Sequence, residues 1–114
     1  MGTQADSDRV YLSYCTCPNT EVADQLARAL VTERLAACVN ILPGVQSIYR
    51  WEEQVETEAE VLLIIKSTAL CVDAMIERIE TLHPYEVPEV IAFPITVGNK
   101  NYLDWVRQCT ANTH

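Results

Sequence analysis

The chain has 114 residues, of which 49% are hydrophobic and 21% charged, which predicts one globular domain. The chain has 16 acidic and eight basic residues, which give a formal net charge of −8. This charge disfavours nucleic-acid and anionic-membrane partners, whereas cations such as metal ions are compatible partners. The apolar runs are far shorter than the roughly 20 residues of a membrane-spanning helix, and no signal peptide is evident. We expect a cytoplasmic protein with a disordered tail over residues 1–8 and a single domain over residues 9–114.

The domain begins with a strand and a helix. Residues 10–17 are rich in β-branched and aromatic side chains and stop at Pro18, which predicts a strand followed by a turn. Apolar residues at helical spacing over residues 22–35 predict an amphipathic helix that Asn19 or Thr20 caps. Its apolar stripe is expected to face the core.

A long hairpin is expected next. Residues 38–51 are typical of one strand that bends at Pro43 and Gly44. Residues 52–58 are predicted to form a polar, acidic turn. Residues 59–66 then return as an apolar strand that pairs with the first.

A second helix follows the hairpin. Apolar side chains of residues 72–82 repeat on one helical face. His83 and Pro84 end this helix, because proline disfavours helical geometry in the residue before it.

The domain is predicted to end with a strand and a short helix. Residues 90–97 form a strand that bends or lies at an edge, because Pro94 interrupts it. Residues 102–106 indicate a C-terminal helix, which Asn99 or Asn101 caps.

This order of elements predicts an α+β, ferredoxin-like βαββαβ sandwich with an extra C-terminal helix. Two right-handed strand-helix-strand units give a four-stranded antiparallel sheet with both helices on one face. The other face and the hairpin stay uncovered, although the hairpin carries apolar and aromatic residues: Ile48, Tyr49, Trp51 and Val55. We expect further copies of the same chain to cover them.

The chain contains five cysteines, an odd number without a secretion signal, which predicts reduced thiols. Three are expected to be small buried hydrophobes: Cys38, Cys71 and Cys109. Cys15 and Cys17 differ, because residues two apart on a strand point the same way and can offer two soft thiolates to one metal ion. The alternative is that both cysteines are ordinary buried core residues, because a lone Cys-x-Cys is also typical of core thiols. Pro18 can in addition turn the Cys17 side chain away from Cys15.

Two prolines fix the loop of residues 83–89, which presents a histidine, a tyrosine and two glutamates. His83 is the only histidine inside the predicted fold, so an imidazole ligand or a pH switch must use it. The alternative is that His83 interacts with the end of its helix and that Glu86 and Glu89 are solvated or paired.

Acidic residues concentrate near the hairpin. Glu56, Glu58 and Glu60 are spaced at two, so they share one face if they lie on a strand, where a solvated surface is favoured over a cation site. Hydrolase and nucleotide-binding motifs are absent from the sequence. A pair of Cys15 and His83 lacks a third orienting residue, so we do not expect an enzyme.

Several motifs in fixed order resemble the CutA divalent-cation-tolerance family, and the resemblance covers residues 10–106. The motifs are Cys15-Thr16-Cys17-Pro18-Asn19, Leu35-Ala36-Ala37-Cys38-Val39-Asn40, Pro43-Gly44, Tyr49-x-Trp51, the loop of residues 83–89, and Tyr102-Leu103-x-Trp105.

The resemblance implies a ferredoxin-like protomer, a tight homotrimer built through sheet edges and the hairpin, and a cytoplasmic protein linked to tolerance of copper and other divalent metals. It attributes copper ligation to Cys15 and His83. Leu82 stands where some members carry a further histidine, which removes one ligand. The fold of the family also resembles that of trimeric PII-type signalling proteins, which implies small-ligand sensing in clefts between protomers.

We therefore expect a trimeric, non-enzymatic divalent-cation tolerance protein. It is predicted to bind copper(II) or another divalent metal ion weakly through Cys15, His83 and Glu86, with Cys17 and Glu89 as helpers. No nucleic-acid or membrane partner is expected.

The alternative is a PII-like trimeric sensor or scaffold. Its proline-fixed loop would shape a pocket between protomers for a small organic ligand or a partner protein. In that case Trp51, Tyr85 and Tyr102 matter more than Cys15.

Overall fold

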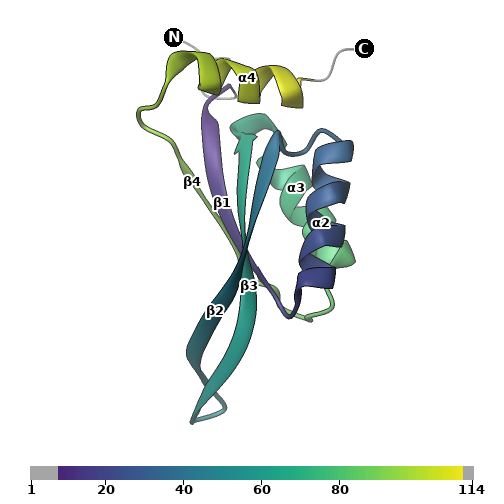
Figure 1. Cartoon of the computed structure of the whole chain (residues 1–114), viewed down its shortest axis with the longest axis vertical. Helices are drawn as coiled ribbons and strands as arrows, with labels where there is room; N and C mark the ends of the chain where they lie inside the picture. Colours follow the sequence, from purple (N-terminus) through teal and green to yellow (C-terminus); the bar gives the residue numbers. More distant parts are fainter. Residues whose placement is uncertain (1–7, 112–114) are drawn as a thin grey trace.

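Within residues 8–111, which the computed structural model describes, the chain forms four strands and three helices (Figure 1). In chain order they are β1 (Val10–Cys17), α2 (Thr20–Thr32), β2 (Cys38–Trp51), β3 (Gln54–Thr68), α3 (Ala69–Leu82), β4 (Val90–Pro94) and α4 (Lys100–Thr110). Residues 1–7, which make up all but the last residue of the expected tail, lie outside the described residues.

The strands form one antiparallel sheet in the order β2-β3-β1-β4, and α2 and α3 lie on one of its faces (Figure 1). This confirms the predicted βαββαβ order with a C-terminal helix. The main core lies between this sheet face and the two helices, and its buried side chains include Cys15, Cys17, Ala23, Leu26, Leu30, Val61, Leu63, Ile65, Met75 and Ile79.

β2 and β3 extend beyond the other strands as a hairpin whose turn is tighter than predicted (Figure 1). Only Glu52 and Glu53 form the turn, with φ of 50° and 71°. The prediction of an acidic turn over residues 52–58 is therefore wrong. Val55 and the alternating residues after it continue β3 up to the turn.

The predicted bend in the hairpin is confirmed. The register between β2 and β3 shifts between Leu42 and Val45, and Gly44 lies there with a φ of 85°. A side chain with a Cβ atom is strained at this φ, so glycine permits the bend that sets how the hairpin leaves the sheet.

Two elements, α2 and β4, end earlier than predicted. α2 ends at Thr32 because Arg34 takes a left-handed φ of 61°. The Leu35 N–H then bonds back to the Leu30 carbonyl over 2.9 Å, so Leu35 packs on the core from a loop. β4 ends at Pro94, although the Ile95 N–H still donates to the Val10 carbonyl over 2.9 Å.

Asparagine caps both helices for which the sequence left two alternatives. The Asn19 side chain accepts the Val22 N–H over 2.8 Å at the start of α2. The Asn99 side chain accepts the Tyr102 N–H over 2.9 Å at the start of α4, which is longer than predicted. Each cap satisfies a backbone donor that the first helical turn leaves unpaired.

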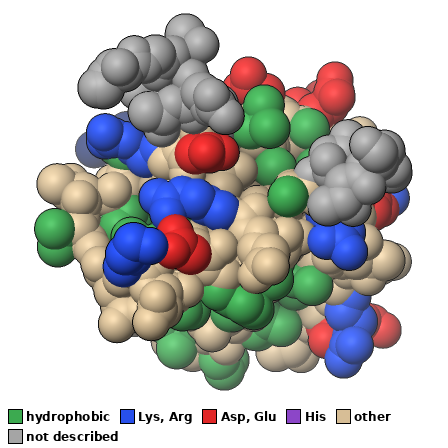
Figure 2. Space-filling model, turned by 90° about the horizontal axis from the view of Figure 1, so that it is seen from above, with side chains coloured by type: hydrophobic (Ala, Val, Ile, Leu, Met, Phe, Trp, Pro, Cys, Tyr) green, Lys and Arg blue, Asp and Glu red, His purple; other side chains and the backbone are tan. Residues whose placement is uncertain are grey.

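α4 crosses one end of the sheet, where Val106 meets Val10 in a second small core. Its surface carries ion pairs from Lys100 and Arg107 to Asp104, of 2.8 and 2.9 Å. Figure 2, which looks onto this end, shows basic and acidic side chains interspersed, with hydrophobic side chains grouped beside them. In the part of the chain that the structure describes, no helix is long and apolar enough to cross a membrane.

The sheet face opposite α2 and α3, here called the open face, carries exposed apolar side chains. Tyr14 and Phe93 make an edge-on ring contact there, with centroids 5.5 Å apart, and Ile91 is 52% exposed. On the hairpin, Trp51 and Val55 are 62% and 66% exposed. One protomer therefore leaves apolar surface uncovered, as predicted.

Candidate metal centre

Strand β1 places two thiols on the sheet face that carries the helices. Cys15 and Cys17 are two residues apart and therefore point the same way, and both are fully buried. They pair with Leu63 and Val61 of β3. Pro18 follows the strand and does not turn Cys17 out of the core.

His83 reaches these thiols from the end of α3. It is the residue after the helix, and Pro84 favours its extended conformation. Its Nε2 atom lies 2.8 Å from the Thr16 carbonyl oxygen, and its Nδ1 atom lies 3.1 Å from the Tyr85 backbone nitrogen. Because the Tyr85 N–H donates to Nδ1, the proton of the neutral imidazole is on Nε2, which donates to Thr16.

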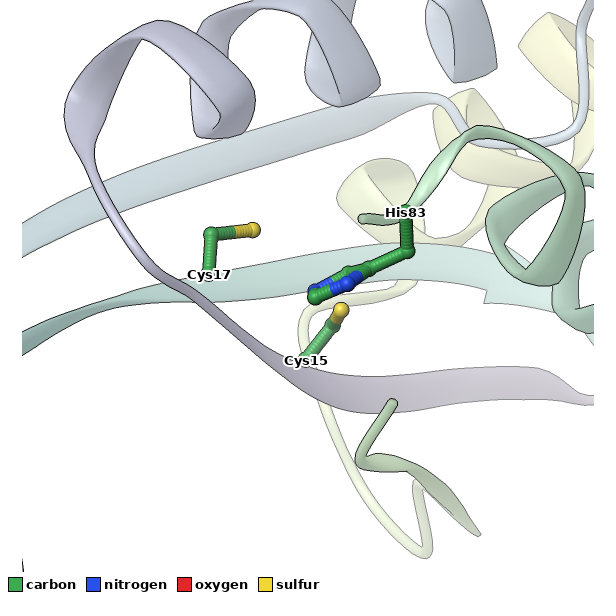
Figure 3. A group of neighbouring side chains, drawn as sticks. All are labelled: Cys15, Cys17 and His83. Carbon is green, nitrogen blue, oxygen red and sulfur yellow. The ribbon is translucent and has the colours of Figure 1, made fainter. Parts of the chain in front are cut away.

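The three side chains meet in the core. The sulfur atoms of Cys15 and Cys17 and a ring nitrogen of His83 all lie within 4.8 Å of one another. Figure 3 shows the imidazole directed toward the two thiols of β1. The structure thus brings together Cys15 and His83, the two residues that the family resemblance singles out, and adds Cys17.

The two neighbouring thiols shift each other's pKa in opposite directions. The interaction with Cys15 lowers the pKa of Cys17. The same interaction, together with burial, raises the pKa of Cys15, whose thiol donates to the Thr16 carbonyl oxygen over 3.8 Å. Thiolates are the metal-binding form of cysteine.

The two glutamates of the loop do not join this group. Glu86 is exposed, and the Glu89 carboxylate accepts a hydrogen bond of 3.4 Å from the hydroxyl of Thr16. Thr16 points away from the cysteines on either side of it, so Glu89 lies on the opposite side of β1. Among residues 8–111, neither glutamate belongs to the thiol–imidazole group. Leu82 packs against the core instead of offering a ligand.

Glu86 and Glu89 instead line a groove of about 850 Å³ between the loop and the hairpin. Aromatic and acidic side chains form much of its wall: Tyr49, Trp51, Tyr85, Glu56, Glu58 and Glu60. The Tyr85 hydroxyl donates to the Glu60 carboxylate over 2.9 Å. Burial of the ring and this carboxylate raise the pKa of Tyr85.

The spacing of the glutamates predicts that they share a face, but this spacing does not place Tyr49 in the same groove. The feature that places Tyr49 beside the glutamates is the hairpin register, in which Tyr49 pairs with Glu56. That register depends on the two-residue turn and on the bulge at Gly44, so it follows only from correct placement of both.

The other cysteines lie outside the thiol–imidazole group. The Cys71 thiol is buried and lies 3.8 Å from the carbonyl oxygens of Arg34 and Thr110. Cys38 and Cys109 are half-buried. These three residues provide matched controls for substitutions of Cys15 and Cys17.

Residues 11–109 match the model of the family described as CutA1 divalent ion tolerance protein. The divalent-cation tolerance protein CutA of Thermus thermophilus is 54% identical over 95 residues, which are 83% of this chain and 92% of that protein. Protein CutA 1 of Oryza sativa subsp. japonica, chloroplastic by name, is 50% identical over 97 residues, which are 85% of this chain and 55% of that protein. The crystal structure of CutA from Xylella fastidiosa aligns with a TM-score of 0.89 at 47% identity, covering 90% of this chain and 99% of that one. The chain belongs to the CutA1 divalent ion tolerance protein family.

Proposed function

We propose that this chain acts in metal-ion tolerance by binding copper or another divalent cation at Cys15, Cys17 and His83. The convergence of two thiols and an imidazole within 4.8 Å carries the proposal. Sulfur and imidazole nitrogen are the donors that bind copper and zinc. The name of the Thermus relative, divalent-cation tolerance protein, supports the same function.

The donor set suits a transition-metal ion without Glu86, the carboxylate ligand predicted from the sequence. Glu86 is exposed at the groove, whereas the thiols and the imidazole are buried. Two sulfurs and one nitrogen in an apolar core are a poor environment for Ca²⁺ or Mg²⁺, which prefer oxygen ligands. The residues that would hold the ion are therefore Cys15, Cys17 and His83.

A titration tests this site. Copper(II) and zinc(II) are titrated by calorimetry into the wild type, Cys15→Ala, His83→Ala and the control Cys109→Ala. We expect one ion per wild-type chain, an unchanged curve for Cys109→Ala and weaker binding for the other two variants. Identical titration curves for all four proteins would contradict a metal site at Cys15 and His83.

The proposed function includes no catalysis. A nucleophile–base pair of Cys15 and His83 needs a free ring nitrogen to take the thiol proton. In His83, Nδ1 already accepts the Tyr85 N–H and Nε2 carries the proton donated to Thr16. Within residues 8–111 the ring nitrogens bond to backbone groups and not to a carboxylate, so the third member that orients a general base is missing there.

We also propose that three copies assemble through sheet edges and the hairpin, as the family resemblance implies, and that this assembly covers the open face. The exposed apolar side chains on both surfaces support association. Ile91→Asp on the open face is expected to yield monomers in sedimentation-velocity experiments. Val31→Asp, on the helix side and 42% exposed, is the matched control that should stay trimeric. A wild-type protomer that stays monomeric at micromolar concentration would contradict the assembly.

The groove between the loop and the hairpin supports a second candidate function, that of a PII-like sensor or scaffold. Its volume of about 850 Å³ and its aromatic and acidic walls suit a small organic ligand or a segment of a partner protein. Under this alternative, neither a chelator nor added metal shifts the melting temperature, whereas Tyr85→Ala alters ligand-dependent stabilisation. Under the metal function, metal addition raises the melting temperature.

The remaining proposals concern partners, organisation and location. The net charge of −8 supports the absence of nucleic-acid and anionic-membrane partners. Residues 9–114 are proposed to act as one domain. The cytoplasmic location stays a prediction, because the rice relative is chloroplastic by name.

A further inference from the structure

The groove between the hairpin and the loop of residues 83–89 has aromatic walls and a volume of about 850 Å³. Its rings come from Tyr49 and Trp51 of β2 and from Tyr85 of the loop. The hairpin side of the groove lies beyond the end of β1, which pairs with β3 only as far as Val61 (Figure 1). A cavity of this size, lined by rings and a few polar groups, is typical of sites for small organic molecules.

The charge of the groove determines which kind of organic molecule fits it. Five glutamates line it, and no lysine or arginine does. Within residues 8–111, none of the ion pairs involves a glutamate of the groove. The negative charge is also evident at the rings, because partial burial and the charge of Glu58 raise the pKa of Tyr49. A cationic ligand is therefore complementary to the groove, and an anionic one is repelled.

The carboxylates follow one another at a regular spacing. Glu56, Glu58 and Glu60 alternate along β3 and so share one face of the hairpin, about 6.8 Å apart from one to the next. An extended covalent chain advances about 1.2 Å per bond, so two amino groups separated by four methylene groups lie about 6 Å apart. Ammonium groups spaced in this way can each meet one carboxylate of the row.

The rings stand along the same row. Tyr49 pairs with Glu56 across the hairpin, and the Tyr85 hydroxyl donates to the Glu60 carboxylate over 2.9 Å. An alkylammonium ion is attracted to the face of an aromatic ring, and its methylene groups can cover the ring. Mg²⁺ keeps several of its own waters and gains little from rings. The groove therefore favours an organic cation over an inorganic one.

We propose that this groove binds a linear aliphatic polyamine, with its ammonium groups at Glu56, Glu58 and Glu60 and its methylene groups against the rings. This inference rests on the second candidate function, in which the groove is a ligand site, and it is independent of the thiol–imidazole group. It replaces the solvated acidic surface that the spacing of the glutamates favours in the sequence.

Calorimetric titration of the full chain with spermidine, 1,4-diaminobutane and butylamine at low salt tests the proposal. We expect the affinity to fall in that order, and MgCl₂ to bind more weakly than 1,4-diaminobutane, which carries the same charge. Glu58→Gln/Glu60→Gln should weaken spermidine binding about 5- to 20-fold, because an exposed ion pair contributes up to about fivefold. Trp51→Leu should weaken it about two- to fivefold through loss of the ring.

Glu77→Gln/Glu80→Gln is the charge-matched control. Both residues are exposed on α3, outside the groove, so this variant should keep wild-type affinity for spermidine. The chain has two tryptophans, which supply a second readout. Spermidine should shift the indole N–H resonance of Trp51 in the NMR spectrum and leave that of Trp105, which does not line the groove, in place.

Three results would overturn the proposal. Equal weakening by the groove pair and the α3 pair would show adventitious attraction to the net charge. MgCl₂ binding as tightly as 1,4-diaminobutane would show that the rings contribute nothing. An unshifted Trp51 resonance would show that the groove has another occupant, a segment of a neighbouring copy included, or none.

A neutral dye separates this inference from the function on which it rests. If spermidine does not bind but N-phenyl-1-naphthylamine binds and Tyr85→Ala abolishes its binding, the polyamine is wrong and the groove remains a ligand site. Binding of neither probe would overturn both. Cys15→Ser/Cys17→Ser should keep wild-type spermidine affinity, so the result does not depend on the metal site.

Discussion

The Nε2 atom of His83 donates a hydrogen bond of 2.8 Å to the carbonyl oxygen of Thr16. Thr16 stands between the two cysteines on β1, and its hydroxyl donates to Glu89 at the groove. One residue therefore contacts both His83, in the thiol–imidazole group, and Glu89, at the groove. A change at His83 is expected to reach both places.

Removal of the imidazole should destabilise the protein even without metal. His83→Ala leaves the Thr16 carbonyl and the Tyr85 N–H without their partners and opens a cavity in the core. An unpaired buried polar group costs about 1–3 kcal/mol, so we expect a loss of about 2–4 kcal/mol in urea unfolding of the apo protein at fixed chain concentration.

His83→Asn is the informative partner of that variant. Its side-chain oxygen can accept the Tyr85 N–H in place of Nδ1, so part of the stability should return. The exposed control Glu80→Ala should match the wild type. If His83→Ala unfolds at the wild-type urea concentration, the two backbone hydrogen bonds do not stabilise the fold.

Metal loading should loosen the loop of residues 83–89. Both ring nitrogens of His83 have backbone partners, so ligation must release either the Tyr85 N–H or the Thr16 carbonyl. We expect the backbone amides around Tyr85 to exchange about tenfold faster or more on loading with copper(I) or zinc(II). Release of the Tyr85 N–H from His83 removes the hydrogen bond that protects this amide from exchange.

The double variant Cys15→Ser/Cys17→Ser is the control for this measurement. It keeps His83 but lacks the sulfur ligands, so metal addition should leave its exchange pattern unchanged. Full protection of the loop in the metal-loaded wild type would contradict the expected exchange of partners.

The hairpin turn stores backbone strain that substitution can release. Glu52 and Glu53 both have positive φ, which costs a residue with a Cβ atom about 1–2 kcal/mol. Asn-Gly is the pair that two-residue turns of this kind favour. We expect Glu52→Asn/Glu53→Gly to raise the free energy of unfolding by about 1–2 kcal/mol in denaturant titrations.

Gly44→Ala should lower the free energy of unfolding, the opposite of the effect expected for the turn variant. No atom lies within 4 Å of the added Cβ, so the φ of 85° is the sole source of strain, and we expect a loss of about 1–2 kcal/mol. Equal effects of the two changes would show that backbone strain does not determine hairpin stability.

The ion pairs of α4 predict a pH dependence of small size. The hydrogen bond and charge of Lys100, assisted by Arg107, lower the pKa of Asp104 below its usual value of 3.8. A lowered carboxyl pKa adds stability above pH 3.8 and loses it as the pH falls through the pKa of the folded state. NMR titration should place the pKa of Asp104 below 3.8 in the wild type and nearer to it in Lys100→Met.

High salt provides the control for Asp104, because its partly exposed carboxylate is screened by mobile ions. The difference between wild type and Lys100→Met should shrink at 1 M salt. The absence of any difference at low salt would show that the ion pair does not form in solution.

Most of the fold could be predicted from local sequence patterns. The β-branched and aromatic content of residues 10–17, the helical spacing over residues 72–82 and the Pro43-Gly44 break each determine nearby backbone through steric and packing preferences. The error over residues 52–58 has a physical cause. A two-residue turn of glutamates violates the glycine preference of left-handed backbone, and only strand pairing on both sides imposes it.

The sequence by itself determined which elements form and in what order, and its motifs indicated the family together with Cys15 and His83. It could not decide whether Cys17 joins them or whether Glu86 does, because that depends on which side of β1 the loop of residues 83–89 crosses. Tertiary packing decided this point: His83 enters the core beside both thiols, whereas Glu86 stays exposed at the groove. The physical reason is that ligands distant in sequence meet only after burial of the apolar faces of β1 and α3 has set their positions.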